Sequence, residues 1–147
     1  MVKFSVPFFP PSTNQAFFVK HGRMHLAKEG KKFKLAVTSY LAQNYRREIL
    51  FFKKNMPYHF YLRLHMENLE NKGWPDKCDT RYKIFDATNR VKLAEDACKE
   101  AFGIDDSQTI AFLTHKCEVA KGASPYLELF VWSLEEEPSP LDEYLRF

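Results

Sequence analysis

Residues 81–108 (RYKIFDATNRVKLAEDACKEAFGIDDSQ) bring together side chains that could bind a metal ion and act on a phosphate. Carboxylate oxygens are the ligands that a hard cation such as Mg²⁺ prefers, and a bound cation can generate hydroxide and neutralise the charge that develops during phosphodiester hydrolysis. A lysine and an amide close to the ion would assist the same reaction. The candidate residues are Asp86, Asn89, Lys92, Asp105 and Asp106.

A second interpretation of these residues involves no chemistry. Asp and Asn are common at helix caps and turns for local reasons, so Asp86 could cap a helix while Asp105 and Asp106 form a turn. Asn89 and Lys92 would then lie on a solvated surface. Spacing alone does not choose between the two interpretations.

One amphipathic helix must position the candidate residues. At 100° per residue, the small apolar residues between positions 87 and 101 fall on one face. Asp86 stands where an N-cap would, and Gly103 ends the pattern. About 20 residues of helix span roughly 30 Å, so carboxylates at its two ends meet only if the chain bends back. The polar face carries Thr88, Asn89, Lys92, Glu95, Asp96 and Lys99.

Two separated blocks of the sequence form a recognisable pattern. One is PPSTN at residues 10–14 with GRMHLAKEG at residues 22–30. The other is the order D-x-x-N-x-x-K-x(3)-D followed by D-D-x-Q, formed by Asp86, Asn89, Lys92, Asp96, Asp105, Asp106 and Gln108. In this order the blocks resemble the RusA-type Holliday-junction resolvases. The resemblance runs from residue 4 to residue 133 and leaves an extra stretch near residues 69–80.

The resemblance implies a magnesium-dependent endodeoxyribonuclease that resolves four-way DNA junctions by paired symmetric nicks, in recombination and repair. Asp86 and Asp106 would be metal ligands, with Asp105 as an additional one. Lys92 would stabilise charge on the phosphate or leaving oxygen, and Asn89 would orient a ligand or a water. Mn²⁺ would substitute for Mg²⁺.

The resemblance also implies a homodimer in the cytoplasm of a bacterial or phage-infected host cell, because a two-fold symmetric protein matches a two-fold symmetric junction. One position departs from the pattern. Family members often carry an acidic residue two positions after the first Asp, where this chain has Thr88. Either a hydroxyl or water substitutes, or the metal count differs, or activity is weak. The alternative function is a catalytically weak or inactive junction-binding protein of the same fold.

Positive charge is concentrated in the first part of the chain. Residues 1–54 contain eleven Lys or Arg and two Glu, whereas residues 101–147 contain three Lys or Arg and nine Asp or Glu. A basic region suits a polyanion, although lysine-rich runs are also common on solvated helix faces. We predict DNA contacts from Arg23, His25, Lys28, Lys31, Lys32, Lys77, Arg81, Lys83 and Arg90.

Hydrophobic periodicity predicts an α+β fold, a single domain in which two main helices pack on a mixed β-sheet. The resemblance implies that this fold is RusA-like. An extended loop is expected at residues 10–15, and a long loop at 67–80 whose Trp74 either stacks on nucleic acid or packs under its own loop. We expect helices at 29–48 and 86–101, and strands at 3–9, 17–20, 23–27, 58–66, 109–119 and 126–134.

The chain of 147 residues is 45% hydrophobic, which indicates a packed globular protein. We predict a nuclease domain at residues 1–134 and an acidic tail at 135–147, which could bind a protein partner, compete with DNA for the basic face, or have no role. No apolar run approaches a membrane span and no leader is visible, so we expect a soluble cytoplasmic protein. The cysteines lack paired spacing, and we expect buried thiols at Cys98 and Cys117.

Overall fold

The computed structural model describes residues 1–77, 79–82 and 87–133, apart from the side chains of residues 13 and 87–89. Its elements follow the order β1 (Val2–Val6), α1 (Thr13–Ala16), β2 (Phe17–Lys20), β3 (Arg23–Leu26), α2 (Lys28–Asn44), α3 (Arg46–Ile49), β4 (Tyr58–Met66), α4 (Ala87–Phe102), the 3₁₀ turn η1 (Asp106–Gln108), β5 (Thr109–Glu118) and β6 (Tyr126–Ser133).

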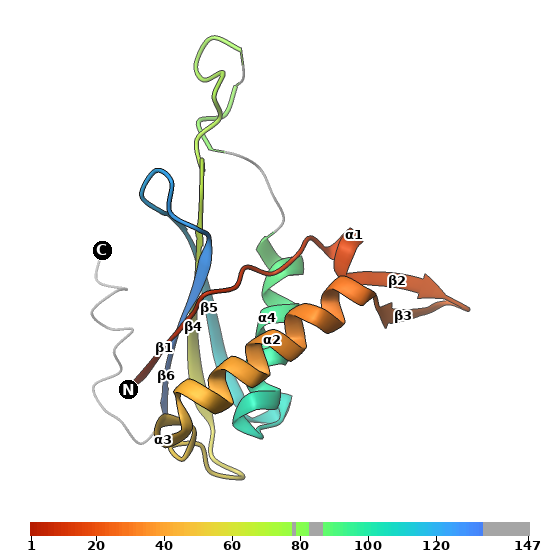
Figure 1. Ribbon diagram of the computed structural model, residues 1–147, viewed down its shortest axis with the longest axis vertical. Coiled ribbons are helices and arrows are strands. Elements are labelled where there is room, and N and C mark those ends of the chain that lie inside the picture. The colour runs from red at the N-terminus through yellow and green to blue at the C-terminus, as the bar shows by residue number, and fades with distance from the viewer. Residues whose placement is uncertain (78, 83–86, 134–147) are drawn as a thin grey trace.

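The main sheet is mixed and has the strand order β1-β6-β4-β5. Strands β4 and β5 are parallel, while β6 is antiparallel to both β1 and β4. A parallel pair needs a crossover connection, and α4 provides it between β4 and β5. Helices α2 and α4 pack on each other on one side of the sheet (Figure 1). The predicted α+β fold with a mixed sheet is therefore confirmed.

One hydrophobic core joins the helices to the sheet. Val37 and Leu41 of α2 and Ala94 and Ala97 of α4 have no exposed side-chain surface or almost none. Alternate residues of the strands face them, because successive side chains of a strand point to opposite faces. These strand residues are Phe4, Val6, Phe60, Leu62, Leu64, Leu127, Leu129 and Val131.

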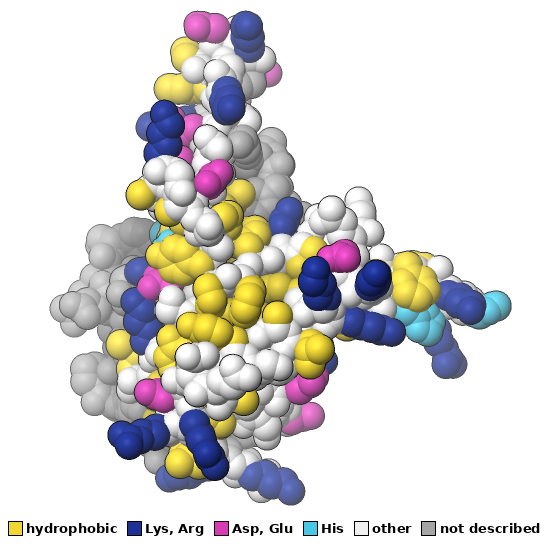
Figure 2. Space-filling view, viewed as in Figure 1, with side chains coloured by type: hydrophobic (Ala, Val, Ile, Leu, Met, Phe, Trp, Pro, Cys, Tyr) yellow, Lys and Arg dark blue, Asp and Glu magenta, His cyan; other side chains and the backbone are white. Residues whose placement is uncertain are grey.

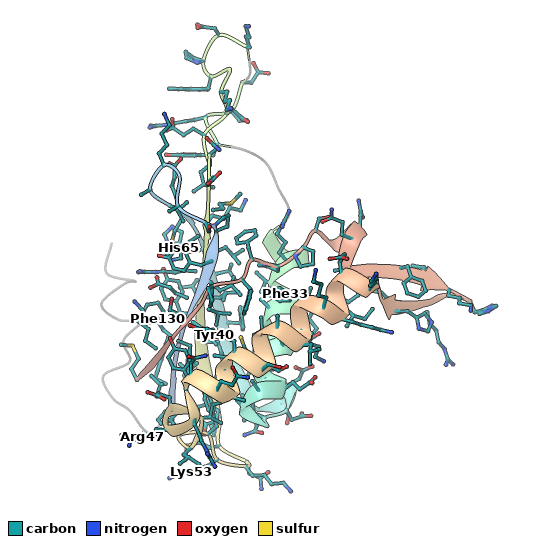
Figure 3. All side chains as sticks on the ribbon, in the orientation of Figure 1. Phe33, Tyr40, Arg47, Lys53, His65 and Phe130 are labelled. Carbon is teal, nitrogen blue, oxygen red and sulfur yellow. The ribbon has the colours of Figure 1, made fainter. Side chains whose placement is uncertain are left out.

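The other face of the sheet carries an ion-pair and aromatic network that includes His65 and the neighbouring strand β6 (Figure 3). The Glu128 carboxylate accepts a hydrogen bond from the Lys3 ammonium at 2.6 Å and contacts His65 Nε2 at 2.7 Å. The imidazole of His65 stacks on Tyr126 with ring centroids 4.1 Å apart. Glu128 therefore ties β1 to β4 across β6.

Strands β2 and β3 form a separate two-stranded sheet that projects from the body beside the start of α2 (Figure 1). We call residues 17–26 the arm. His21 and Gly22 form its two-residue turn, with φ of 51° and 70°, as a right-twisted hairpin requires. At the base, a Cβ at Gly30 would lie 2.5 Å from the Ala16 carbonyl oxygen and 2.7 Å from Cδ1 of Leu26, so α2 approaches the base of the arm as closely as only glycine permits.

Three local expectations were wrong. Strand β1 ends at Val6, and residues 13–16 form a helical turn where we expected an extended loop. The turn forms because the Ser12 carbonyl accepts hydrogen bonds from two backbone amides within four residues. The helix expected at 29–48 is interrupted at Tyr45, whose hydroxyl binds both the amide and the carbonyl of Ser5. Its φ of −127° lies outside the helical region.

The long loop after β4 projects away from the sheet (Figure 1). Its two legs are joined by the Glu70–Tyr82 bridge and by hydrogen bonds from Asn71. The guanidinium of Arg81 pairs with Glu70 and lies over the ring of Trp74, which stays 45% exposed. Trp74 is therefore packed within its own loop and still accessible.

Two further expectations concern thiols and membranes. Cys98 is buried, as expected, whereas Cys117, also expected to be buried, is only half-buried. Burial raises the pKa of the Cys98 thiol to about 12, which makes it unreactive at neutral pH. Across the described part of the chain, the helices are too short or too polar to cross a bilayer.

Candidate active site

The chain reverses direction directly after α4. Gly103 adopts φ of +67°, which suits glycine, and the amide of Ile104 donates to the carbonyl of Lys99 at 3.2 Å. Asp105 then caps η1, and Asp106 begins it. This reversal places Asp106 beside the helix that has just ended.

Asp106 is held against α4 by a buried lysine. The Lys99 side chain is only 6% exposed, and its ammonium contacts the Glu95 carboxylate one turn earlier. The same ammonium donates to Asp106 Oδ1 at 2.8 Å. This hydrogen bond, reinforced by the positive charge, lowers the pKa of Asp106 below its ordinary value, so Asp106 is ionised at neutral pH.

A second lysine faces the other oxygen of the same carboxylate. Lys92 Nζ lies 3.6 Å from Asp106 Oδ2 and 2.9 Å from Asp96 Oδ1. The hydrogen bond to Asp96 raises the pKa of Lys92, which stays charged. We call these residues the lysine–carboxylate cluster: Lys92, Glu95, Asp96, Lys99 and Asp106.

The turn at Gly103 is the bend that brings the chain after α4 back along the helix. Lys92 is five residues into α4, about 7.5 Å from its first residue Ala87 along the helix axis. Because Asp106 reaches Lys92, it lies far closer to the start of α4 than a straight continuation of the helix would allow. Asp86, immediately before α4, lies outside the described residues, as do the side chains of Thr88 and Asn89.

Asp105 has a structural role. Its carboxylate accepts a hydrogen bond from the Ser107 amide at 2.9 Å, which lowers the pKa of Asp105. Gln108 completes this capping box by accepting from the Asp105 amide, and its own amide donates to the carbonyls of Lys53 and Met56. Gln108 therefore fixes the loop that holds Asp106, and one carboxylate oxygen of Asp105 is already hydrogen-bonded within the turn.

Within the cluster, the carboxylates of Asp96 and Asp106 are the donors that suit a hard divalent cation. Asp106 is ionised and its side chain is 69% exposed, so oxygen lone pairs remain open to solvent beside the two lysine contacts. Asp96 lies close, since both carboxylates contact the Lys92 ammonium. Within residues 1–77, 79–82 and 87–133 no three His, Cys, Asp or Glu form a metal-binding group.

The predicted DNA-binding residues fall in separate places. Arg23 and His25 are exposed on the arm, and three lysines follow in the first turns of α2, namely Lys28, Lys31 and Lys32. Figure 2 shows basic side chains along the arm and the adjoining end of the body. Lys77 and Arg81 lie on the projecting loop, and Lys83 lies outside the described residues.

Arg90 has a packing role that the sequence did not suggest. Its guanidinium donates to the Pro10 carbonyl at 2.6 Å and lies over the ring of Phe9, which fastens the segment after β1 to α4. Desolvation lowers the pKa of Arg90 from its very high ordinary value. DNA binding by Arg90 stays a prediction.

The sequence did not indicate that Lys99 and Glu95 form the buried ion pair that holds Asp106. Both were placed on the polar face of the helix without a role. Their four-residue spacing is a signal for an ion pair within a helix. Its burial depends on Asp106 and η1 folding over this part of α4, which periodicity does not reveal.

Comparison with known proteins agrees with the pattern in the two sequence blocks. No curated protein matches the chain. The family model described as endodeoxyribonuclease RusA matches residues 7–129, a span that contains the arm, α2, α4 and the lysine–carboxylate cluster. The resemblance is confirmed, and the chain belongs to the RusA endodeoxyribonuclease family.

Proposed function

We propose that this chain is a divalent-metal-dependent endonuclease that resolves four-way DNA junctions. It would use Mg²⁺, with Mn²⁺ as a substitute, and nick two opposed strands as a homodimer in a bacterial or phage-infected cell. The family supports cleavage of DNA. The observation that carries the proposal is the ionised carboxylate of Asp106, held beside α4 between Lys92 and Lys99.

Asp86 and Asp106 would hold the ion in this scheme. Asp106 is the better candidate of the acidic pair, because Asp105 already caps η1. When bound, the ion supplies hydroxide and neutralises charge on the phosphate. Lys92, whose side chain is 52% exposed, would stabilise charge on the phosphate or leaving oxygen, and Asn89 would orient a ligand or water.

A cleavage assay on synthetic four-way junctions tests this function. Asp86→Asn and Asp106→Asn should each abolish cleavage in Mg²⁺ and Mn²⁺ while junction binding stays intact or becomes tighter, since each change removes an ion ligand and a negative charge near phosphates. Asp76→Asn, on the exposed loop, is the matched control and should cut normally. Normal cleavage by either site variant would remove that residue from the ligand set.

Pairing of the nicks is tested on a plasmid that extrudes a cruciform. Two coordinated nicks in one binding event linearise the plasmid, whereas independent nicks accumulate open circles first. Linear product without an open-circle intermediate would support a dimer with two active sites. Accumulating open circles would contradict paired action and leave single-strand cleavage.

The second candidate function is junction binding without cleavage, favoured by the neutral residue Thr88 at a position where acidic residues are common in the family. It predicts band shifts on junctions and intact DNA in both metals. The acidic tail at residues 135–147 lies outside the described residues, and its binding of a protein partner remains a proposal. Deleting it should leave cleavage unchanged if it serves only as a docking peptide.

A further inference from the structure

The arm exposes apolar side chains that packing does not explain. Phe18, Val19 and Met24 are 48%, 71% and 67% exposed. They lie on a two-stranded ribbon that projects from the body (Figures 1 and 2). Such a ribbon is marginally stable by itself, and exposing apolar surface adds no stability. The exposed surface of the arm is therefore open to a partner, and the chemistry of its two faces decides which face binds one.

The two faces of the arm differ in chemistry. On one face the cross-strand pairs are Phe18 with His25 and Lys20 with Arg23. The rings of Phe18 and His25 stack, with centroids 5.4 Å apart and planes 24° from parallel. The other face has Val19 opposite Met24 near the tip. One face is thus aromatic and cationic, and the other is aliphatic.

An aromatic pair beside cations is the chemistry that binds unpaired nucleobases. A base stacks on an aromatic ring, while lysine and arginine pair with the phosphates on either side of it. The charge of this region favours a nucleic acid over an uncharged or basic partner. The arm has no acidic residue, and Glu29 alone is acidic in the following turns of α2. The arm and those turns carry Lys20, Arg23, Lys28, Lys31 and Lys32.

The base of the arm is attached to the body by several contacts, which fix the position of its aromatic and cationic face. The amide of Ala27 donates to the carbonyl of Ala16 at 2.7 Å, which closes the base of the arm. Phe17 and Leu26 pack against the core from the base, and Gly30 lets α2 approach without a gap. These contacts hold the base of the arm in place, so the arm keeps its orientation when its tip contacts a ligand.

We propose that the arm is a wedge that stacks Phe18 and His25 on an unpaired base at the branch point of the DNA. This inference rests on the proposed function and names the feature of the substrate that the protein recognises. Bases inside an intact duplex are already stacked, whereas a branch point can offer an unstacked one at small cost. The arm thus favours branched DNA over plain duplex.

The test compares three variants for binding without divalent ions, so that no DNA is cut. Affinities for a four-way junction and for a duplex of the same sequence are measured by fluorescence anisotropy, and 2-aminopurine at the branch point reports base stacking. Phe18→Ala should weaken junction binding about 5- to 150-fold, the effect of removing one stacking ring, and leave duplex binding within about two-fold. Phe18→Trp should restore the junction affinity.

Val19→Ala is the matched control, because Val19 is more exposed than Phe18 and lies on the opposite face. It should leave both affinities and the 2-aminopurine signal unchanged. Circular dichroism melts check that every variant folds. The proposal is overturned if Phe18→Ala binds the junction as wild type does, if it weakens junction and duplex equally, or if Val19→Ala alone weakens binding.

Failure of the proposed function gives a different result. If the wild-type protein binds neither junction nor duplex, the proposed function and the wedge fall together. If the wild type binds and cuts junctions while Phe18→Ala has no effect, the proposed function stands and the wedge is refuted.

Discussion

Lys99→Met is the change that most directly tests the buried ion pair of the lysine–carboxylate cluster, Lys99 with Glu95. Methionine keeps most of the apolar volume of the lysine side chain, so the main loss is the ammonium. That ammonium lies in a side chain that is 6% exposed, and it contacts the Glu95 carboxylate, in a side chain that is 16% exposed. The variant therefore leaves a nearly buried carboxylate without its cation.

The size of the effect follows from burial. Removing one partner of a buried ion pair costs about 3 to 5 kcal/mol, because the remaining charge is not compensated. Glu95 keeps some contact with solvent, so we expect the lower end, about 3 kcal/mol. For a domain of this size that corresponds to a fall in Tm of roughly 6 to 12 °C.

Two further variants isolate the cause. Lys92→Met, in which the lost ammonium is on a 52% exposed side chain, should cost at most about 1 kcal/mol, as exposed pairs do. Glu95→Gln combined with Lys99→Met removes the uncompensated charge and should recover most of the lost stability. Urea unfolding followed by circular dichroism measures all of them. Equal losses for Lys92→Met and Lys99→Met would refute the argument from burial.

Three other predictions concern charge. The logarithm of the junction-binding constant should fall with the logarithm of the salt concentration, with a slope near −0.9 per phosphate contact. Neutralising Arg23, Lys28, Lys31 and Lys32 together should make this slope less steep. An unchanged slope would mean that the DNA binds elsewhere on the protein. Thr88→Asp should raise Mg²⁺ affinity, measured by calorimetry, and Thr88→Val should weaken the magnesium dependence at a helix cost well under ~1 kcal/mol; an inert Thr88→Asp would put position 88 outside the site. Desolvation raises the pKa of Glu128, but hydrogen bonds from Lys3 and His65 outweigh it, so the pKa in the folded protein is lowered overall. Glu128 therefore stabilises the folded protein above its ordinary pKa of 4.5, and this stabilisation is lost as the pH falls through the lower pKa of the folded state. Glu128→Gln should flatten the acid limb of the unfolding free energy below pH 4.5, whereas Glu118→Gln on exposed strand surface should not.

Most elements could be predicted because their patterns are local. Strand β4 begins and ends at the expected Tyr58 and Met66, since alternation is visible within nine residues. The arm follows from its two-residue turn at His21 and Gly22. The interruption at Tyr45 could not be predicted in this way, because Tyr45 contacts Ser5, forty residues earlier, and periodicity does not reveal such a contact.

The site could be predicted in part for the same reason. The types and order of Asp86, Asn89, Lys92 and Asp106 are in the sequence, and they indicate metal-assisted chemistry. The approach of Asp106 to Lys92 depends on the turn at Gly103, which decides whether Asp106 lies beside α4 or beyond it. Residue type marks a lysine as exposed by default, so the burial of Lys99 is visible only once η1 is in place.

The charge of the cluster leads to an expectation about the number of bound ions. Lys92 and Lys99 bring two positive charges against three negative ones from Glu95, Asp96 and Asp106, which leaves one net negative charge. Asp86, directly before α4, would add a second, and the neutral Thr88 adds none. Asp105 is left out of this count because its carboxylate caps η1 by accepting from the Ser107 amide. One divalent cation balances two negative charges, whereas a second would add uncompensated positive charge among two lysines. We therefore expect one Mn²⁺ per chain, counted by electron paramagnetic resonance during titration of the DNA-free protein; two tightly bound ions would refute this charge count.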